Sequence, residues 1–337
     1  MVKVFVCAFW DSLYFEYLQH YPIFIAFNFF MKNNIKGHIA LFAAYTIFGL
    51  NLPVARSLVP DIVNPYVMTL FCIVGATVLF WIASLFVKKE TVPLKDIGKL
   101  AIASLFCITL NNFAFVVGLS RTTPVDASIV VTMLPVFCMI LAALVLKEPI
   151  TFKKAIGVLI GASGALLLIL GQQATTDIGA KNNILGNLII FISVASFAVY
   201  LTFFKDLISR YSPITLMKWM FLFSSICSLP FFTNEIMATN FHLFDAGVYW
   251  RMTFSIVCAS FVSFMLIPVG QKVLRPTTIS MYNYIQPIVA SLIAVVVGMD
   301  VFGWKKALAM VLVFSGVYIV TMSKSKVQID AEKKEKV

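Results

Sequence analysis

Ten long apolar runs are the feature that most constrains this chain. Charged or turn-forming residues bound each run, and the runs lie at about 38–58, 65–87, 97–119, 124–146, 153–171, 184–204, 213–233, 249–270, 277–298 and 304–323. About 20 apolar residues are enough for a helix to cross the hydrocarbon core of a bilayer. Helix is the only open-chain structure that satisfies its own backbone groups in lipid. The sequence therefore predicts an all-α integral membrane protein with ten transmembrane helices.

Composition excludes a water-soluble enzyme, because 61% of the residues are hydrophobic and 12% are charged, against about 25% charged in soluble domains. The 26 Lys and Arg outnumber the 15 Asp and Glu. With the N-terminus inside, most of these basic residues fall in cytoplasmic loops, as the positive-inside rule requires. We therefore expect a multi-pass cell-membrane protein with both termini in the cytoplasm. Residue usage favours a bacterial inner membrane, and no nucleic-acid-binding module is visible.

The two ends of the chain differ from the apolar runs. Residues 1–36 form an N-terminal extension that is rich in aromatics but interrupted by Asp11, Glu16 and His20. Translation starting at Met31 would remove most of it; alternatively, residues 1–30 form a segment lying in the membrane interface. Residues 324–337 are predicted to be a basic cytoplasmic tail.

The sequence also repeats itself. A shift of 152 residues places 124–170 on 276–322 without a gap and aligns Pro135 with Pro287, the Lys-Lys-Ala triplet at 153–155 with that at 305–307, and the Ser-Gly pair at 163–164 with that at 315–316. A shift of 149 places the first run on the sixth. The chain is therefore predicted to be two five-helix units, 37–171 and 184–323.

Five is an odd number, so the second unit must enter the membrane upside down relative to the first. The result is an inverted repeat with a pseudo-two-fold axis in the membrane plane. Two similar halves of opposite orientation can exchange conformations, which predicts alternating access of a central site to the two sides.

Polar residues inside the spans are the candidates for a substrate cavity, because polar side chains in lipid tend to face the bundle interior. The candidates are Asn51, Asn111, Asn112, Thr132, Tyr200, Asn283, Tyr284 and Gln286. Asn51, Asn111 and Asn112 fit a clamp between helices as well as a cavity. Gly157, Gly161 and Gly164, at small-residue spacing, are interpreted as a helix-packing face.

Prolines and cations give further candidates. Pro53, Pro135 and Pro287 are either kinks or hinges of a gate, since proline frees a carbonyl one turn upstream. Lys218 and Arg251 lie near span ends, where their side chains are expected to reach the headgroups; turned inward, either would contact an anionic group.

Catalytic and metal chemistry is not indicated. Six cysteines form no Cys-x-x-Cys pair and three histidines are scattered, so we expect no metal site, no disulfide framework and no cofactor. A membrane enzyme would need a nucleophile–base or metal cluster, and no phosphate-binding loop for nucleotide hydrolysis occurs. The lack of a mid-span Asp or Glu favours facilitated diffusion or exchange over a carboxylate proton relay.

Several motifs resemble those of the EamA group of the drug/metabolite transporter superfamily. They are Phe48-Gly49-Leu50-Asn51, Thr122 to Ser128 leading to Pro135, Lys147-Glu148-Pro149-Ile150-Thr151, Arg275-Pro276-Thr277-Thr278 and Gln286-Pro287. The second unit departs from the pattern at Gly298-Met299-Asp300. The resemblance implies ten helices around a central cavity, lined mainly by spans 1, 3, 4, 6, 8 and 9, and export of small metabolites.

The sequence thus predicts a secondary transporter, not an enzyme, that exports or exchanges small polar or amphipathic metabolites such as amino acids. The alternative is a carrier of anionic phosphorylated or nucleotide-linked solutes that uses basic cavity residues. The expected partners are a small-molecule substrate and the lipid bilayer.

Overall fold

A computed structural model describes residues 33–59, 62–119, 121, 130–171, 183–239, 244–296 and 303–323. The N-terminal extension with Met31, the motif from Thr122 to Ser128, the departure at Asp300 and the tail 324–337 lie outside these residues. Within the described ranges the chain is helical and contains no strand, which confirms the all-α prediction.

Each of the ten apolar runs contains helix over its described part. In the first unit these are α3 (Asn33–Arg56), α4 (Pro65–Ala83), α5 (Leu94–Ser104) continuing through the π-helical η2 (Leu105–Leu110) into α6 (Asn111–Leu119), α8 (Leu134–Val145) and α9 (Phe152–Gly171). In the second they are α10 (Asn183–Phe203), α11 (Lys205–Arg210), α12 (Pro213–Ala238), α13 (Ala246–Phe254) through the π-helical η4 (Ser255–Val262) into α14 (Ser263–Val273), α15 (Pro276–Met281), the 3₁₀ turn η5 (Tyr282–Tyr284), α16 (Ile285–Val296) and α17 (Trp304–Thr321).

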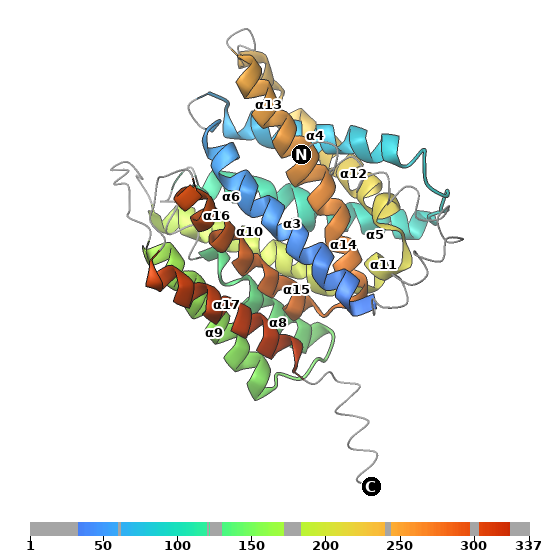
Figure 1. The fold of residues 1–337 in the computed structure, drawn as a ribbon. Coiled ribbons are helices and arrows are strands. Elements are labelled where there is room, and N and C mark those ends of the chain that lie inside the picture. Colours follow the sequence, from blue (N-terminus) through green and yellow to red (C-terminus); the bar gives the residue numbers. More distant parts are fainter. Residues whose placement is uncertain are drawn as a thin grey trace, which may run out of the picture.

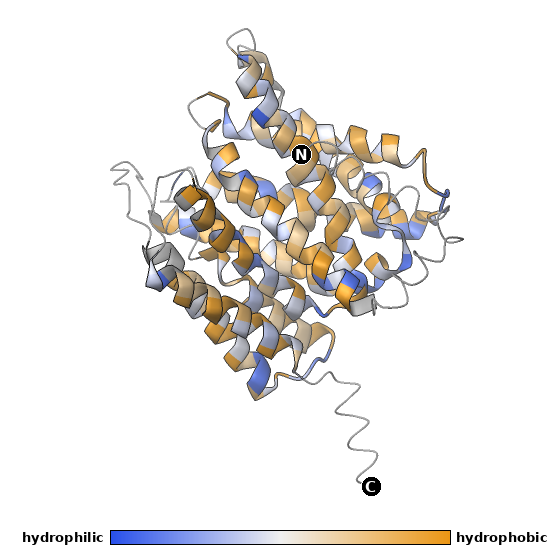
Figure 2. Ribbon diagram, in the orientation of Figure 1, coloured by the Kyte–Doolittle hydropathy of each residue, from blue (hydrophilic) through white to orange (hydrophobic). Residues whose placement is uncertain are grey.

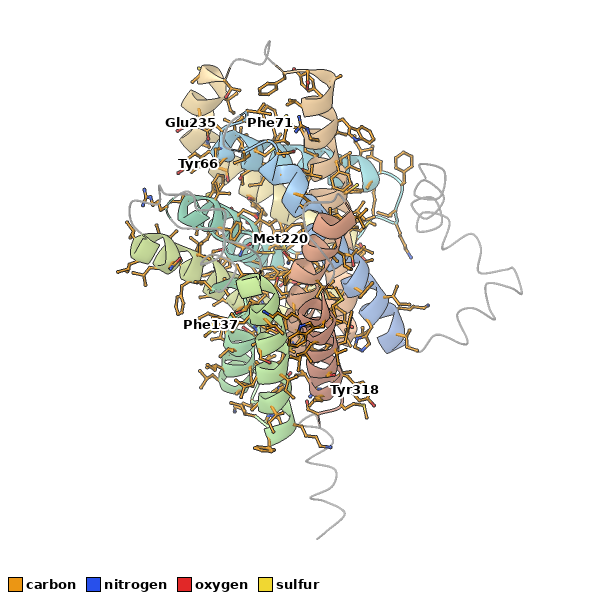
Figure 3. The ribbon with its side chains drawn as sticks, turned by 60° about the vertical axis from the view of Figure 1, so that its left-hand side comes forward. Tyr66, Phe71, Phe137, Met220, Glu235 and Tyr318 are labelled. Atoms are coloured by element: carbon orange, nitrogen blue, oxygen red, sulfur yellow. The ribbon has the colours of Figure 1, made fainter. Side chains whose placement is uncertain are left out.

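Length and composition suit a membrane. Among the described residues, five segments are long and apolar enough to span a bilayer, namely Ile35–Ala55, Pro65–Ala83, Leu94–Gly118, Ile184–Phe203 and Ala246–Val273, and shorter apolar helices lie at Leu134–Val145 and Ala307–Thr321. Figure 2 shows hydrophobic residues along most of the helices. Large apolar side chains such as Leu144 and Tyr318 are exposed while Met220 is fully buried, and Figure 3 places Met220 amid the helices and Tyr318 on α17 at the outside. Outward apolar side chains are suited to lipid.

The helices pack in a pattern that is unchanged when the two units are exchanged. Figure 1 shows one of these contacts, with α9 and α17 side by side. Helix α14 packs on α3 as α6 packs on α10, and α16 packs on α3 as α8 packs on α10. Helix α4 packs on η4 as α12 packs on α5, and three other large contacts join counterparts directly, since α9 packs on α17, α4 on α12, and α8 on α15. A self-complementary contact set of this kind is the mark of a two-fold rotation. The two units are therefore arranged as a pseudo-symmetric pair.

Hydrogen bonds show the same symmetry at single residues. Asn111, the first residue of α6, donates through Nδ2 to the Ser193 carbonyl on α10 at 3.0 Å. Its counterpart Ser263, the first residue of α14, donates to the Ala44 carbonyl on α3 at 3.3 Å. Ala44 and Ser193 are themselves matched by the 149-residue shift. Both third helices also carry a π-helical segment just before this bond, a feature frequent at functional sites.

Two further bonds lie across the axis. Asn283 donates to the Val131 carbonyl at 3.3 Å, and Tyr284 donates to the Thr132 carbonyl at 3.1 Å. In each bond the donor lies 152 residues after the acceptor, which is the repeat shift itself. A residue that contacts its own counterpart must lie beside the rotation axis. The η5 turn therefore lies beside its own counterpart, the residues just before α8, as is expected next to a two-fold axis.

Small residues hold α9 against α17, as their spacing predicts. A Cβ on Gly157 would lie 3.0 Å from the Gly316 carbonyl, and one on Gly164 would lie 2.7 Å from the Ala309 carbonyl. Gly157 and Ala309 are counterparts, as are Gly164 and Gly316, so these approaches obey the two-fold as well. The absence of side chains lets the two helix backbones touch, which supplies the packing that stabilises helices in lipid.

Candidate functional site

The η5 turn gathers four of the predicted cavity residues. Gln286 donates through Nε2 to Asn283 Oδ1 at 2.7 Å, and Asn283 in turn binds the Val131 carbonyl, just before α8 in span 4. Tyr284 is buried against Thr132, itself buried. The tight 3₁₀ turn rotates these side chains toward α8, so the polar groups of span 9 are linked to each other and to span 4.

Two of the predicted asparagines bind neighbouring helices. Asn51 accepts a hydrogen bond from Ser255 on η4 at 2.7 Å, and Asn111 exchanges hydrogen bonds with Ser193 on α10. Asn112 instead donates to the Ile108 carbonyl of its own helix at 2.8 Å, which satisfies a carbonyl of the π-helical segment. In this conformation Asn51 and Asn111 join the first helix of each unit to the third helix of the other.

Tyr200 belongs to a second group of buried polar side chains. Its hydroxyl donates to Gln271 Oε1 on α14 at 3.0 Å and also contacts the Cys107 thiol on η2. Tyr45 on α3 lies close enough to interact electrostatically with Tyr200 and with Cys107. We call Tyr45, Cys107, Tyr200 and Gln271 the tyrosine cluster; it draws one residue from each of spans 1, 3, 6 and 8.

Two members of this cluster carry buried polar atoms without a partner, a feature that Thr46, Ser228 and Glu235 share elsewhere in the described residues. The Tyr45 hydroxyl and Gln271 Nε2 have no hydrogen-bond partner, although both residues are only 2% exposed. The Thr277 hydroxyl on α15, at 0% exposure, is likewise unpaired. Each such atom costs about 1–3 kcal/mol, and buried polar groups are normally satisfied. Unsatisfied polar groups on adjacent helices are expected where a bound ligand supplies the missing hydrogen-bond partners.

The two predicted anion contacts lie elsewhere. The Lys218 ammonium lies 5.3 Å from the ring centre of Trp81 and 5.9 Å from that of Trp219, in cation–π contact. Arg251 donates to the Ser57 carbonyl and hydroxyl at 3.2 and 2.9 Å. The structure therefore brings neither cation to the tyrosine cluster or to the η5 turn.

The three candidate hinge prolines occupy different settings. Pro53 lies inside α3 and is exposed. Pro135 is buried in the first turn of α8, where a missing N–H costs nothing. Pro287 follows the η5 turn near the start of α16, and the Cβ position of Gly49 lies 3.1 Å from the Gln286 carbonyl just before it. Pro135 and Pro287 therefore both follow a turn, at 132–133 and at η5, whereas Pro53 lies within regular helix.

A charged group lies at the bundle end that the charge rule assigns to the cytoplasm. Lys154 Nζ is 2.7 Å from Glu148 Oε2, and the Lys154 side chain is only 1% exposed. Burial lowers the pKa of Lys205, and Glu148 partly offsets this. Burial also lowers the pKa of Arg275, which donates to the Val320 and Thr321 carbonyls at the end of α17. This inner charge group joins the ends of spans 5, 6, 9 and 10.

A further contact at that end links the two units. Tyr211, between α11 and α12, donates to Asp96 Oδ2 on α5 at 2.7 Å. This bond raises the pKa of Tyr211, because ionising the phenol would remove the proton that binds the carboxylate. Glu90 accepts from the Ser212 backbone and hydroxyl beside it. Among the residues that the structure describes, no group of three or more His, Cys, Asp and Glu side chains is arranged to hold a metal ion.

Comparison with known proteins identifies the fold. The profile of the EamA-like transporter family matches residues 35–170 and again 184–322. The chain belongs to this family. Because the family unit is matched twice, the duplication extends over both halves. Members of the EamA-like family are membrane transporters, so this chain is a multi-pass membrane transporter.

Individual relatives are distant. An "uncharacterized transporter" of Archaeoglobus fulgidus is 27% identical over 202 residues, covering 60% of this chain and 69% of the relative. "Uncharacterized transporter YetK" of Bacillus subtilis is 21% identical over 297 residues, covering 87% and 89%. A solved crystal structure superposes with a TM-score of 0.69 at 16% identity, over 86% of this chain and 97% of its own; at that identity it shows likeness of fold alone.

Sequence reasoning missed Tyr45 and Gln271. Tyr45 stands in an aromatic-rich run, where it looks like packing, and Gln271 precedes Lys272 at a span end, where it looks like a headgroup contact. The signal that was available is the combination of a hydroxyl and an amide on helices that the family resemblance assigns to the cavity. Their missing partners become visible only in three dimensions.

Proposed function

We propose that the protein is a secondary transporter that exports or exchanges small polar or amphipathic metabolites, amino acids or related compounds, by alternating access. The observation that carries this is the isologous contact set, above all the bonds of Asn283 and Tyr284 to their own counterparts. Units related by a two-fold can adopt each other's conformations without losing the helix pairs, because every pairing maps onto another.

The odd number of helices in each unit supports the inverted arrangement. A two-fold that relates oppositely threaded units lies in the membrane plane, so exchanging their conformations exchanges which side a central site faces. The orientation with both termini in the cytoplasm, in a bacterial inner membrane, remains part of this proposal.

Contacts at the two ends of the bundle are suited to act as gates. Ser57 and Arg251 join the units at the predicted outer end, while Asp96 and Tyr211 join them at the inner end. In an alternating cycle each contact must break in turn. The Ser57–Arg251 contact is exposed, so it can open at modest cost. The Asp96–Tyr211 bond is buried in this conformation and must become solvated when the inner end opens.

Cross-linking tests the cycle directly. The double variants Ser57→Cys/Arg251→Cys and Asp96→Cys/Tyr211→Cys, in a background whose native cysteines are replaced, are reconstituted into liposomes. A cleavable bifunctional thiol reagent is expected to stop counterflow of labelled amino acids in both variants, and reduction is expected to restore it.

A matched control separates locking from chemical modification. Asp206→Cys/Ser209→Cys places the same reagent within one turn of α11, where the Ser209 hydroxyl donates to the Asp206 carbonyl at 2.8 Å and no relative motion is needed. Its transport should survive cross-linking. Continued counterflow in both fully cross-linked test variants would refute alternating access through these ends.

Carriage of anionic phosphorylated or nucleotide-linked solutes has less support. That function calls for a cation facing the central polar groups, and Lys218 and Arg251 are engaged with Trp81 and Ser57 instead. The same liposomes, loaded with labelled phosphate esters, provide the comparison.

A further inference from the structure

We propose that the tyrosine cluster binds the carboxylate of the transported solute, with Tyr45 and Gln271 as its direct hydrogen-bond donors. This inference rests on the proposed transport function and names the chemical group that the site recognises. Neither residue was among the cavity candidates from the sequence.

The donor set is held in place by its neighbours. Tyr200 donates to Gln271 Oε1 at 3.0 Å, which orients the amide so that its two N–H hydrogens point elsewhere. Those hydrogens and the Tyr45 hydroxyl have no partner. Tyr45 is steadied by an edge contact with Phe48, whose ring centre lies 5.8 Å away. Two preoriented donor groups are therefore left without a hydrogen-bond partner in this conformation.

The number of hydrogens favours a carboxylate. Gln271 offers two and Tyr45 offers one, whereas a carbonyl oxygen accepts about two and a carboxylate about four hydrogen bonds. Such bonds to a charged acceptor are stronger than those to a neutral one. A carboxylate thus uses the full set, while an amide or ester uses only part of it.

The placement of the cluster also fits a transported solute. Its residues come from spans 1, 3, 6 and 8, and the pairs α3 with α14 and α6 with α10 are the ones that the two-fold exchanges. A ligand held between them touches both units at once. Its binding is therefore sensitive to any relative movement of those units, as coupling of binding to the cycle requires.

Recognition by neutral donors distinguishes this site from a phosphate site. The cationic side chains of the inner charge group, Lys205 and Arg275, lie at the helix ends and interact with Glu148. A carboxylate held by a hydroxyl and an amide keeps its own charge. The solute would therefore be an amino acid or another monocarboxylate in preference to a dianionic phosphate ester.

Tyr45→Phe provides the principal test, in full-length protein reconstituted into liposomes. The probes are L-leucine, L-phenylalanine and L-serine, together with the amides of the same three amino acids. Wild-type protein is expected to take up the acids in preference to the amides. Tyr45→Phe is expected to lower the apparent affinity for the acids about 10- to 100-fold, the size of one hydrogen bond to a charged group, and to change uptake of the amides less.

Thermal stability without ligand separates a binding role from a structural one. An unpartnered hydroxyl stabilises nothing, so Tyr45→Phe should melt at the same temperature as wild type or higher. Tyr318→Phe, on an exposed ring of α17, is the matched control and should change neither melting nor uptake. The double variant Gln271→Met/Tyr200→Phe removes the amide without leaving the Tyr200 hydroxyl unpaired. This variant should also lose the preference for acids over amides.

The outcomes separate the two proposals. Equal affinity of wild type and Tyr45→Phe for the acids, or a lower melting temperature of Tyr45→Phe without ligand, overturns the carboxylate site and leaves the transporter proposal standing. Uptake of neither acids nor amides by wild type overturns the amino-acid assignment and the carboxylate site with it.

Discussion

Removal of Glu148 offers a quantitative test of the inner charge group. The Lys154 ammonium is almost fully buried and has Glu148 as its ion-pair partner at 2.7 Å. Glu148→Gln keeps the shape of the side chain and one acceptor oxygen but removes the charge. The buried ammonium then has no counter-ion, a change that costs about 3–5 kcal/mol when one partner of a buried pair is lost.

The expected change in melting temperature follows from the size of the chain. Unfolding entropy near 60 °C is roughly 2.1 cal/mol/K per residue, so in a chain of 337 residues this cost corresponds to a drop of roughly 4–7 °C. Lys205 and Arg275 also interact with Glu148, which adds to the loss. A fluorescence melting assay on detergent-purified protein measures it.

Two companion variants make the reasoning refutable. Lys99→Met breaks an exposed pair with Asp96, 3.6 Å long, and should cost less than about 1 kcal/mol. Glu148→Gln combined with Lys154→Met removes both charges and should recover most of the stability lost in the single variant. If Glu148→Gln and Lys99→Met have the same melting temperature, or if the double variant is the least stable of the three, the buried pair does not stabilise the fold as argued.

Three further predictions concern packing, pH and helix termination. Gly316→Ala should destabilise the protein by about 1–3 kcal/mol, because its Cβ would lie 2.6 Å from the Gly161 nitrogen. The control Gly98→Ala meets nothing within 4 Å and should stabilise the protein by up to about 1 kcal/mol. Equal melting temperatures of the two variants would contradict this prediction. Although partial burial opposes it, hydrogen bonding from Ser212 leaves the pKa of Glu90 lowered. The contribution of Glu90 to stability is therefore present above its unfolded-state pKa of about 4.3 and is lost as pH falls through its folded-state pKa. The stability advantage of wild type over Glu90→Gln should vanish at acid pH. An advantage that grows at acid pH would contradict this prediction. Arg275→Met should lower the melting temperature, since the last carbonyls of α17 lose their donor, while Arg210→Met, at an exposed residue, should not.

The helices were predictable because lipid leaves the backbone no alternative. A run of apolar residues such as 65–87 becomes α4 with almost the same limits, and Pro65 and Asn64 mark its start as cap residues do. The π-helical segments at Leu105 and Ser255 were not predictable, because no local pattern separates them from α-helix. They depend on side chains of other helices, such as the Ser196 hydroxyl that binds the Phe106 carbonyl at 2.7 Å.

Polar residues of the site were predictable as a class but not as partners. Asn111 is plainly costly in lipid, yet its bond to Ser193 requires knowing that α6 lies against α10. Tyr45 and Gln271 lie on helices that the family resemblance assigns to the cavity, but their lack of a partner could not be predicted, since burial without a partner is a property of the packed bundle. Pairings within one helix, such as Asn112 with the Ile108 carbonyl, are within reach of spacing arguments.

The hydrogen bonds of Asn283 and Tyr284 are not matched by equivalent bonds from the other unit. In these two bonds one copy contributes the side chains of Asn283 and Tyr284, while the other contributes the carbonyls of Val131 and Thr132. The Val131 side chain has no polar atom with which to return the bond from Asn283, so these two counterparts contribute unequally. If the two units exchange conformations, these two hydrogen bonds have no equivalent in the opposite state. The two ends of the cycle then differ in free energy, and the resting protein favours one face of the membrane.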